Sequence, residues 1–425
     1  MIRFHNGLLL TMANGTDIVP GEVWTDGARI AYVGPARPDA PAFTREIDLA
    51  GNLLMPGFKN AHTHSAMTFL RSFADDLPLE RWLFDKVFPL EAKLTPDHIY
   101  EFSRLAILEY LSGGITAAFD MYYHIDAYAR ANMDCGFRTA LCCAVGASNP
   151  DWSAAARDYE RFNALSPLVS YKLGFHAEYT ASDELLRYLS GLAHELRAPV
   201  WTHNSETESE VQGCRERHGG RTPTEYFDSL GLFDHGGGGY HCVWLSQHDM
   251  EIFKARGLSA VTCPASNAKL ASGVAPLTEL MEKGINLAVG TDGPASNNGL
   301  DLFREMYLAC VLQKLRQRDA AACDADAILT AATLGGARAM GLTDCDCIAP
   351  GKQADLIVLD LHRPNMRPLH NIPKNLVYSG SRENVRLTMI AGKILYENGE
   401  FHIGEDPERI YARAQQMTKE IIDNA

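Results

Sequence analysis

Eight short apolar segments, each followed by a longer helical pattern, lie between Pro56 and Leu342 and constrain the fold of this chain most strongly. Alternating strands and helices favour a parallel sheet covered by helices, and eight such units are typical of a (β/α)₈ TIM barrel. The eight strands are predicted at residues 57–61, 115–120, 138–145, 169–175, 199–202, 240–243, 260–262 and 287–291.

The two ends of the chain carry a different pattern, in which apolar and polar residues alternate and glycine or proline interrupts the runs. Strands are predicted at 2–12, 21–25, 29–33 and 46–54, and again at 355–360, 385–391 and 393–397. Neither set is large enough to enclose a core alone. We therefore predict an α/β chain in which residues 1–55 and 350–404 form one composite β domain, residues 56–349 form the barrel, and residues 405–425 form a C-terminal helix.

The charge balance limits the kind of partner that this chain can bind. The sequence contains 39 Lys and Arg against 53 Asp and Glu, a formal net charge of −14. Such a surface repels phosphate backbones and anionic headgroups, so a small neutral or cationic substrate is favoured over nucleic acid or a membrane. The sequence shows neither a secretion leader nor an apolar run of about 18 residues, and we expect a cytoplasmic protein.

Histidines and one aspartate lie at the carboxyl ends of predicted strands, where barrel enzymes place their catalytic groups. His62 and His64 follow the first strand, and side chains two residues apart on an extended segment point to the same side. His203 ends the fifth strand and Asp292 ends the eighth. Three imidazoles and one carboxylate suit a divalent ion such as Zn²⁺, with one position left for water.

Other polar residues near strand ends have two interpretations each. His241 lies on the sixth strand. Glu206 follows the fifth strand. It can move a proton to or from a metal-activated water, or it can be an ordinary acidic residue in the first turn of the next helix. Glu208 is placed equally well for the proton-transfer role. His176, at the end of the fourth strand, either contacts a substrate or is a structural histidine. The glycine run 236–239 precedes a strand, which argues against a phosphate-binding loop.

Five motifs are spread along the chain: Pro56-Gly-Phe-Lys-Asn-Ala-His62-Thr-His64, His203-x-x-Glu206, His241-Cys242, Gly290-Thr-Asp292-Gly and Pro350-Gly-Lys-Gln-Ala-Asp355. Together they resemble the amidohydrolase superfamily over nearly the whole chain. Further motifs are similar to the 5-methylthioadenosine/S-adenosylhomocysteine deaminase branch, a neighbour of the triazine chlorohydrolases: Ala74-Asp-Asp-Leu-Pro-Leu-x-x-Trp82, Pro89-Leu-Glu91, Asp120-Met-Tyr122 and Pro264-x-Ser-Asn267-x-Lys269.

The resemblance implies a barrel with a β-sandwich side domain and one zinc ion per subunit, held by His62, His64, His203 and Asp292. It also implies a deaminase in which zinc-bound hydroxide attacks a carbon of an adenine ring. By matching position, Glu206 would carry a proton to a ring nitrogen, His241 would orient the water, and Asp292 would act as ligand and base.

Three further residues receive substrate-binding roles from the resemblance. Glu91 would accept a ribose hydroxyl, His176 would contact the purine, and Trp82 would form a wall of the pocket. Without the resemblance, Glu91 would be interpreted as a solvated helix carboxylate and Trp82 as core packing. Family members that accept S-adenosylhomocysteine are thought to hold its tail with arginines just beyond the third strand, but residues 142–152 contain none and Arg138 lies earlier.

Three functions follow from these observations. The first is deamination of an adenine nucleoside, such as 5′-methylthioadenosine, adenosine or S-adenosylhomocysteine. The second keeps the hydrolytic chemistry but acts on another amino- or chloro-substituted heterocycle, such as a pterin, guanine or a triazine. The third is a non-catalytic scaffold, since this fold also serves structural homo-oligomers, and the complete set of metal ligands disfavours it. A homo-oligomeric enzyme is compatible with the first two.

Overall fold

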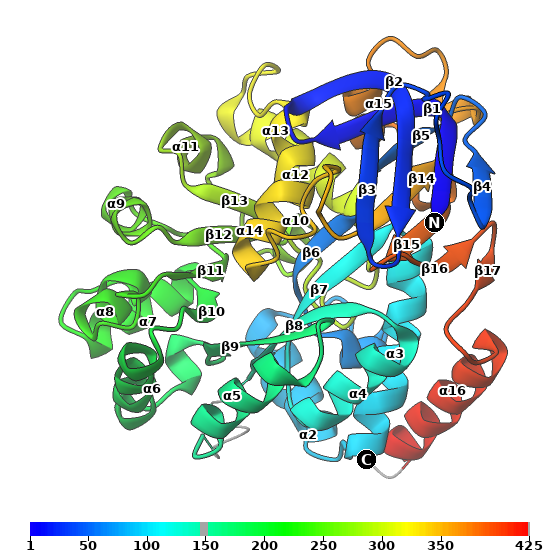
Figure 1. The fold of residues 1–425 in the computed structure, drawn as a ribbon. Coiled ribbons are helices and arrows are strands. Elements are labelled where there is room, and N and C mark those ends of the chain that lie inside the picture. The colour runs from blue at the N-terminus through cyan, green and yellow to red at the C-terminus, as the bar shows by residue number, and fades with distance from the viewer. Residues whose placement is uncertain (145–151, 424–425) are drawn as a thin grey trace.

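The computed structural model describes residues 1–144 and 152–423 and contains the predicted barrel (Figure 1). Neighbouring strands in its eight-stranded sheet are parallel and follow chain order. The last strand lies beside the first, where the Thr291 N–H donates to the His62 carbonyl at 3.0 Å. The strands are β6 (Phe58–Thr63), β7 (Ile115–Tyr122), β8 (Arg138–Cys143), β9 (Val169–Gly174), β10 (Val200–Asn204), β11 (Gly237–His241), β12 (Ser259–Thr262) and β13 (Asn286–Val289).

Helices surround the barrel, and several begin at a hydroxyl side chain that accepts a backbone N–H of the first turn, as at Thr95, Ser182, Thr207, Thr222 and Ser246. The helices are α3 (Pro96–Ser112), α4 (Ile125–Cys135), α5 (Ala155–Leu165), α6 (Asp183–Leu196), α7 (Glu208–Arg217), α8 (Pro223–Ser229), α9 (Gln247–Arg256), α10 (Pro264–Lys269), α11 (Leu277–Glu282), α12 (Leu302–Gln317), α13 (Ala325–Thr330) and α14 (Gly336–Met340). Short helical turns after β6 include α1 (Leu79–Trp82) and α2 (Phe88–Glu91) and lie over the carboxyl end of the barrel.

The sixth strand begins three residues earlier than the sequence predicts, because the glycine run belongs to it. A Cβ at Gly238 would lie 2.3 Å from the Ser259 carbonyl oxygen and 2.5 Å from the Trp201 ring. Trp201 is 2% exposed inside the barrel, so glycine is needed to leave room for the indole. The prediction that this run precedes the strand is therefore wrong.

The end segments form a second sheet in which N-terminal and C-terminal strands lie side by side (Figure 1). The predicted strand 46–54 is divided in two at a turn through Ala50 and Gly51, both with positive φ. The order is β17 (Glu400–Phe401), β16 (Lys393–Glu397), β15 (Val385–Ile390), β14 (Leu356–Leu359), β5 (Leu53–Pro56), β1 (Ile2–Met12), β2 (Gly15–Asp26) and β3 (Arg29–Gly34), with β4 (Arg45–Asp48) also paired to β1.

This sheet curls so that strands distant in its order enclose one core. A Cβ at Gly392, in the turn before β16, would lie 1.8 Å from the carbonyl oxygen of Gly27, in the turn before β3. The enclosed apolar cluster includes Phe4 and Ile30 from one part of the sheet and Leu387 from the other. The small β-sandwich domain formed by both chain ends is thereby confirmed, whereas the boundaries at residues 55, 350 and 404 stay a prediction.

A buried ion pair joins the β domain to the barrel at the amino end of β8. Arg138 donates to both carboxylate oxygens of Asp355, at 2.6 and 3.0 Å, and the side chains are 2% and 0% exposed. Burial alone would raise the pKa of Asp355, but the Arg138 guanidinium holds it below its ordinary value. Because active sites of barrels lie at the carboxyl ends of strands, Arg138 is a structural residue.

The chain closes with helix α16 (Pro407–Asp423), as the sequence predicts, and this helix lies against α3 (Figure 1). Arg413 reaches Glu101 of α3 at 3.1 Å, and Arg104 of α3 is paired with Glu405 just before α16. Within residues 1–144 and 152–423, every helix is too short or too polar to cross a bilayer.

Candidate active site

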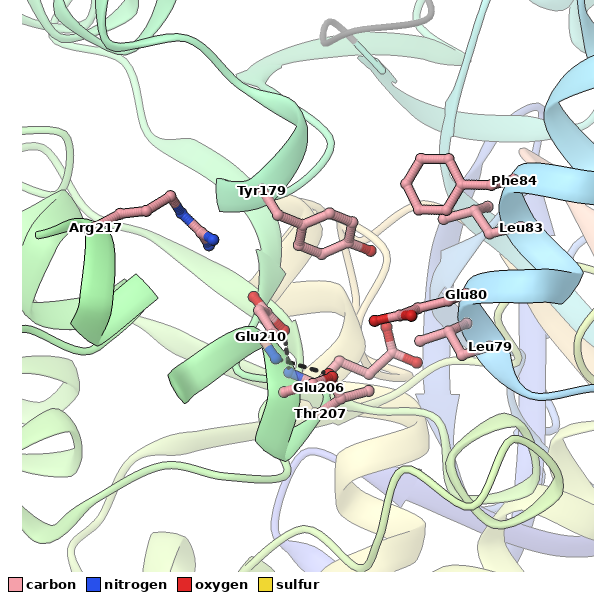
Figure 2. Close-up of a pocket in the computed structure, with 10 residues that line it drawn as sticks. Leu79, Glu80, Leu83, Phe84, Tyr179, Glu206, Thr207, Glu210 and Arg217 are labelled. Atoms are coloured by element: carbon pink, nitrogen blue, oxygen red, sulfur yellow. Dashed lines mark hydrogen bonds between the residues drawn. The ribbon is translucent and has the colours of Figure 1, made fainter. Parts of the chain in front are cut away.

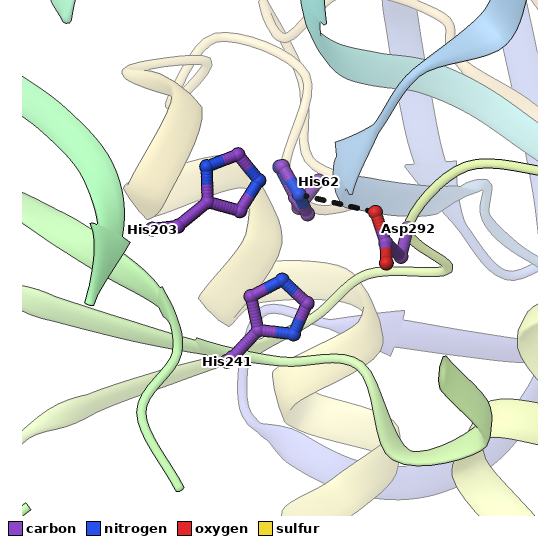
Figure 3. A group of neighbouring side chains, drawn as sticks. All are labelled: His62, His203, His241 and Asp292. Atoms are coloured by element: carbon purple, nitrogen blue, oxygen red, sulfur yellow. Dashed lines mark ion pairs between the residues drawn. The ribbon is translucent and has the colours of Figure 1, made fainter. Parts of the chain in front are cut away.

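Three imidazoles and one carboxylate converge at the carboxyl end of the barrel (Figure 3). One side-chain N or O atom from each of His62, His203, His241 and Asp292 lies within 4.8 Å of the others. His64 joins this group, because its Nε2 is 3.2 Å from Asp292 Oδ1 and 3.4 Å from His203 Nε2. The structure thus brings the four predicted ligands together and places His241 beside them.

Three of the histidines are oriented by an acceptor on the far side of the ring. A carbonyl or amide oxygen accepts hydrogen bonds but cannot donate one, so the Nδ1 that faces it must carry the hydrogen. The Nε2 lone pair is then free for a metal ion. The contacts are His64 Nδ1 to the Met121 carbonyl at 2.6 Å, His203 Nδ1 to the His176 carbonyl at 2.6 Å, and His241 Nδ1 to Asn267 Oδ1 at 2.8 Å.

His62 and Asp292 complete the case for a cation. Both ring nitrogens of His62 are buried without a hydrogen-bond partner among the described residues, and a metal–nitrogen bond would satisfy one of them. Asp292 accepts hydrogen bonds from Ser266 (2.6 Å) and Ser296 (2.7 Å) on Oδ2, while Oδ1 faces the histidines. The donor set therefore fits a divalent ion of the zinc type.

The electrostatics of the cluster favour neutral imidazoles at His62 and His203 and an ionised carboxylate at Asp292. Burial lowers the pKa of His62 to about 3 and lowers that of His203 well below its usual value. Burial would also lower the pKa of His64, but the contact with Asp292 raises it to about 8. Burial alone would raise the pKa of Asp292, and the adjacent histidines hold it well below its ordinary value.

The backbone turns sharply where the strands deliver these side chains. Ser205, His241 and Asp292 all have φ between 52° and 68°, in the left-handed region that residues other than glycine rarely adopt. Such conformations are concentrated at functional sites, where the surrounding structure compensates for their cost.

A cavity of about 430 Å³ lies over the cluster, and we call it the inner cavity. His64, His203, His241 and Asp292 form its floor, and the predicted substrate contacts Trp82 and His176 also line it. Trp82 is 6% exposed and lies in α1, beside Leu83. His176 binds Thr180 Oγ1 through Nδ1 at 2.9 Å, and burial lowers its pKa to about 3, so its ring is neutral.

The structure distinguishes between the two acids that follow the fifth strand. Glu206 lines the inner cavity, with Oε2 3.8 Å from His241 Nε2 and Oε1 accepting a hydrogen bond from Ser272 at 3.2 Å. Burial raises the pKa of Glu206, a direction that suits a group that accepts and returns a proton during the reaction. Glu208 is exposed at the first residue of α7.

Glu91 is not a solvated helix carboxylate, and it is not among the described residues that line the inner cavity. Its side chain is buried and accepts a hydrogen bond from the Tyr122 hydroxyl. Burial raises the pKa of Glu91 to about 7, against the opposing effect of that hydrogen bond. Tyr122 belongs to a motif that carried no functional role in the sequence.

Glu210 is a buried residue of the site that the sequence reasoning missed. One carboxylate oxygen accepts the backbone N–H of Ser205 at 3.2 Å, and the other accepts that of Glu206 at 2.7 Å. A recognisable signal was present, because Thr207-x-x-Glu210 matches the Ser/Thr-x-x-Glu pattern of a helix capping box.

The described structure does not cover residues 145–151, so most of the segment beyond the third strand that lacks arginines lies outside it.

Comparisons with known proteins agree with this geometry. A 5′-deoxyadenosine deaminase of Methanothermobacter thermautotrophicus is 39% identical over 94% of this chain and 95% of its own length. A 5-methylthioadenosine/S-adenosylhomocysteine deaminase of Nitratidesulfovibrio vulgaris is 40% identical over 94% and 92% of the two chains.

Solved structures show the same architecture. An adenosine deaminase from Xanthomonas campestris, solved with bound zinc, matches with a TM-score of 0.95 and 35% identity over 99% of this chain and 98% of its own. An atrazine chlorohydrolase from Arthrobacter aurescens shares the fold with a TM-score of 0.90 at 23% identity, over 98% of this chain and 100% of its own. Residues 53–395 match the model of the amidohydrolase family, and the histidines and aspartate lie together at the carboxyl end of the barrel. This chain therefore belongs to the amidohydrolase family.

Proposed function

We propose that the protein is a zinc-dependent hydrolase that deaminates adenine nucleosides, such as 5′-deoxyadenosine or 5′-methylthioadenosine, to the inosine analogue and ammonia. The observation that carries this proposal is one cavity containing the histidine–aspartate cluster together with the buried acid Glu206. The names of the relatives at 39% and 40% identity support the choice of an adenine nucleoside.

In this proposal His62, His64, His203 and Asp292 hold one zinc ion per subunit. When bound, the ion supplies a Lewis acid that makes water nucleophilic near neutral pH. We assign His241 to the reaction and not to zinc coordination, because its Nε2 also faces Glu206.

The protons then move between named groups of the chain. Water adds to the ring carbon that bears the amino group, a C–O bond forms and the C–N bond breaks. Glu206 carries one water proton to the neighbouring ring nitrogen, and Asp292 passes the other to the departing amine, which leaves as ammonia. His241 orients the attacking oxygen by a hydrogen bond.

The remaining roles concern substrate binding. Trp82 provides an apolar wall for the purine, and the neutral ring of His176 supplies a hydrogen bond to it. Glu91 accepts a ribose hydroxyl, with Tyr122 holding the carboxylate in place. We also propose a cytoplasmic, homo-oligomeric enzyme that acts on small molecules and not on nucleic acids, in keeping with the net charge of −14 and with ten cysteines that form no disulfide among the described residues.

An ultraviolet screen tests the proposal. Zinc-loaded protein is incubated with adenosine, 5′-deoxyadenosine, 5′-methylthioadenosine and S-adenosylhomocysteine, and in parallel with guanine, a pterin and an aminotriazine. Loss of adenine absorbance with release of ammonia is expected for the nucleosides. Turnover of the free bases alone would move the protein to the second class of heterocycle, and no ammonia from any compound would refute the proposal.

A further inference from the structure

A second cavity, of about 580 Å³, adjoins the inner cavity (Figure 2). We call it the outer cavity. Two groups of residues line it on opposite sides: Leu79, Glu80, Leu83 and Phe84 on one, and Tyr179, Glu206, Thr207, Ser209, Glu210 and Arg217 on the other. The two cavities share Leu79, Leu83, Tyr179 and Glu206 as common walls, so they are contiguous.

The inner cavity opens toward the outer one. Among the described residues that line the inner cavity, Tyr179 alone is exposed, at 36%, and it is also a wall of the outer cavity. Phe84, 52% exposed, lies at the outer rim. A substrate with its reacting ring against the histidine cluster can therefore extend its remaining part past Tyr179 and into the outer cavity.

The walls of the outer cavity combine apolar surface with negative charge. Leu79, Leu83 and Phe84 supply the apolar part, and Glu80 projects from the same segment (Figure 2). Glu80 is exposed, and its carboxylate is the acidic group that this segment contributes to the cavity wall.

Positive charge in the outer cavity is already neutralised. Arg217 is the one arginine or lysine among the described residues that line either cavity. Its Nε donates to Glu178 Oε1 at 3.0 Å, and its Nη2 bonds the other oxygen of that buried carboxylate. An anionic group entering the cavity would therefore meet Glu80 without a free cation to balance it.

We propose that the outer cavity binds the 5′-substituent of the nucleoside, and that it admits neutral or cationic substituents and rejects nucleoside 5′-phosphates. This inference rests on the proposed function and adds a subsite with a charge preference. The apolar walls contact a 5′-deoxy or 5′-alkylthio group, and Glu80 pairs with an ammonium group where the substituent carries one.

The experiment compares three substrates that differ only at the 5′ position: 5′-deoxyadenosine, 5′-amino-5′-deoxyadenosine and adenosine 5′-monophosphate. Two variants of equal charge change are compared, Glu80→Lys in the outer cavity and Glu208→Lys as the control. Glu208 is exposed on α7, two residues beyond Glu206, and does not line the described cavity walls. Glu80→Gln supplies an intermediate charge.

For the wild type we expect kcat/KM to fall in the order ammonium, neutral, phosphate. Glu80→Lys should raise the phosphate-to-neutral ratio by about tenfold or more and lower the ammonium-to-neutral ratio, with Glu80→Gln between, because a like charge has become an opposite one. Glu208→Lys should change either ratio by no more than about twofold, since an exposed charge farther away is screened by salt.

Equal ratio changes in Glu80→Lys and Glu208→Lys would overturn the subsite, because they would reflect net charge and not the cavity. Equilibrium dialysis of the same three compounds against each variant reads the preference without turnover. A wild type that binds adenine nucleosides but deaminates none of them would refute the proposed function, whereas deamination with unchanged ratios in Glu80→Lys would refute only the subsite.

Discussion

Replacement of Glu210 by glutamine tests whether the catalytic acid is positioned by a buried carboxylate. Glu210 accepts the backbone N–H groups of Ser205 and Glu206 at 3.2 and 2.7 Å. Glutamine keeps the size and one acceptor but turns an NH₂ group toward the other N–H. A buried donor left without a partner costs about 1–3 kcal/mol. If that cost displaces Glu206 in the transition state, kcat falls by about 5- to 150-fold with little change in KM.

Glu208→Gln is the matched control, because Glu208 lies on the same helix and is exposed. Its kcat should stay within about twofold of the wild type, as for most surface substitutions. Initial rates with 5′-deoxyadenosine are measured by absorbance, with zinc content and thermal midpoint recorded for each variant. A folded, zinc-loaded Glu210→Gln protein with wild-type kcat would refute the reasoning, and a lowered midpoint with unchanged kcat would assign Glu210 a purely structural role.

The other predictions concern the acid, the metal and the join between domains. Glu206→Gln should lower kcat by about 10²- to 10⁴-fold while zinc content stays at the wild-type level, and loss of zinc would instead make Glu206 a ligand. Removing metal with a chelator should abolish deamination and lower the thermal midpoint, and zinc should restore both; an unchanged midpoint would contradict metal binding by the buried cluster. Arg138→Met should cost about 3–5 kcal/mol in urea unfolding, because it leaves Asp355 buried without its partner, and Arg138→Met with Asp355→Leu should recover part of this. Arg138 holds the pKa of Asp355 below its ordinary value, so the stability from this pair is present above about pH 4 and is lost as pH falls through the folded-state pKa of Asp355. The double variant should therefore lose that acid sensitivity.

The strands that could be predicted are those whose own side chains carry the signal. β7 and β9 begin at the predicted residues, because β-branched and aromatic residues mark them. β11 begins earlier than predicted, because its glycines are required by Ser259 and Trp201 on the neighbouring strands, a contact that no local pattern reveals.

Within the site, the sequence by itself determined the chemistry: which histidines, aspartate and glutamate occur at strand ends, and hence which ion and which proton transfers they suit. Only the tertiary structure decided that Glu206 and not Glu208 faces the cavity, that His241 lies beside the proposed metal ligands, and that Tyr122 holds Glu91. The physical reason is that donor atoms and pKa values are properties of single side chains. Their convergence depends instead on closure of the barrel and on the left-handed turns at its strand ends, which are set by contacts between segments far apart in the chain.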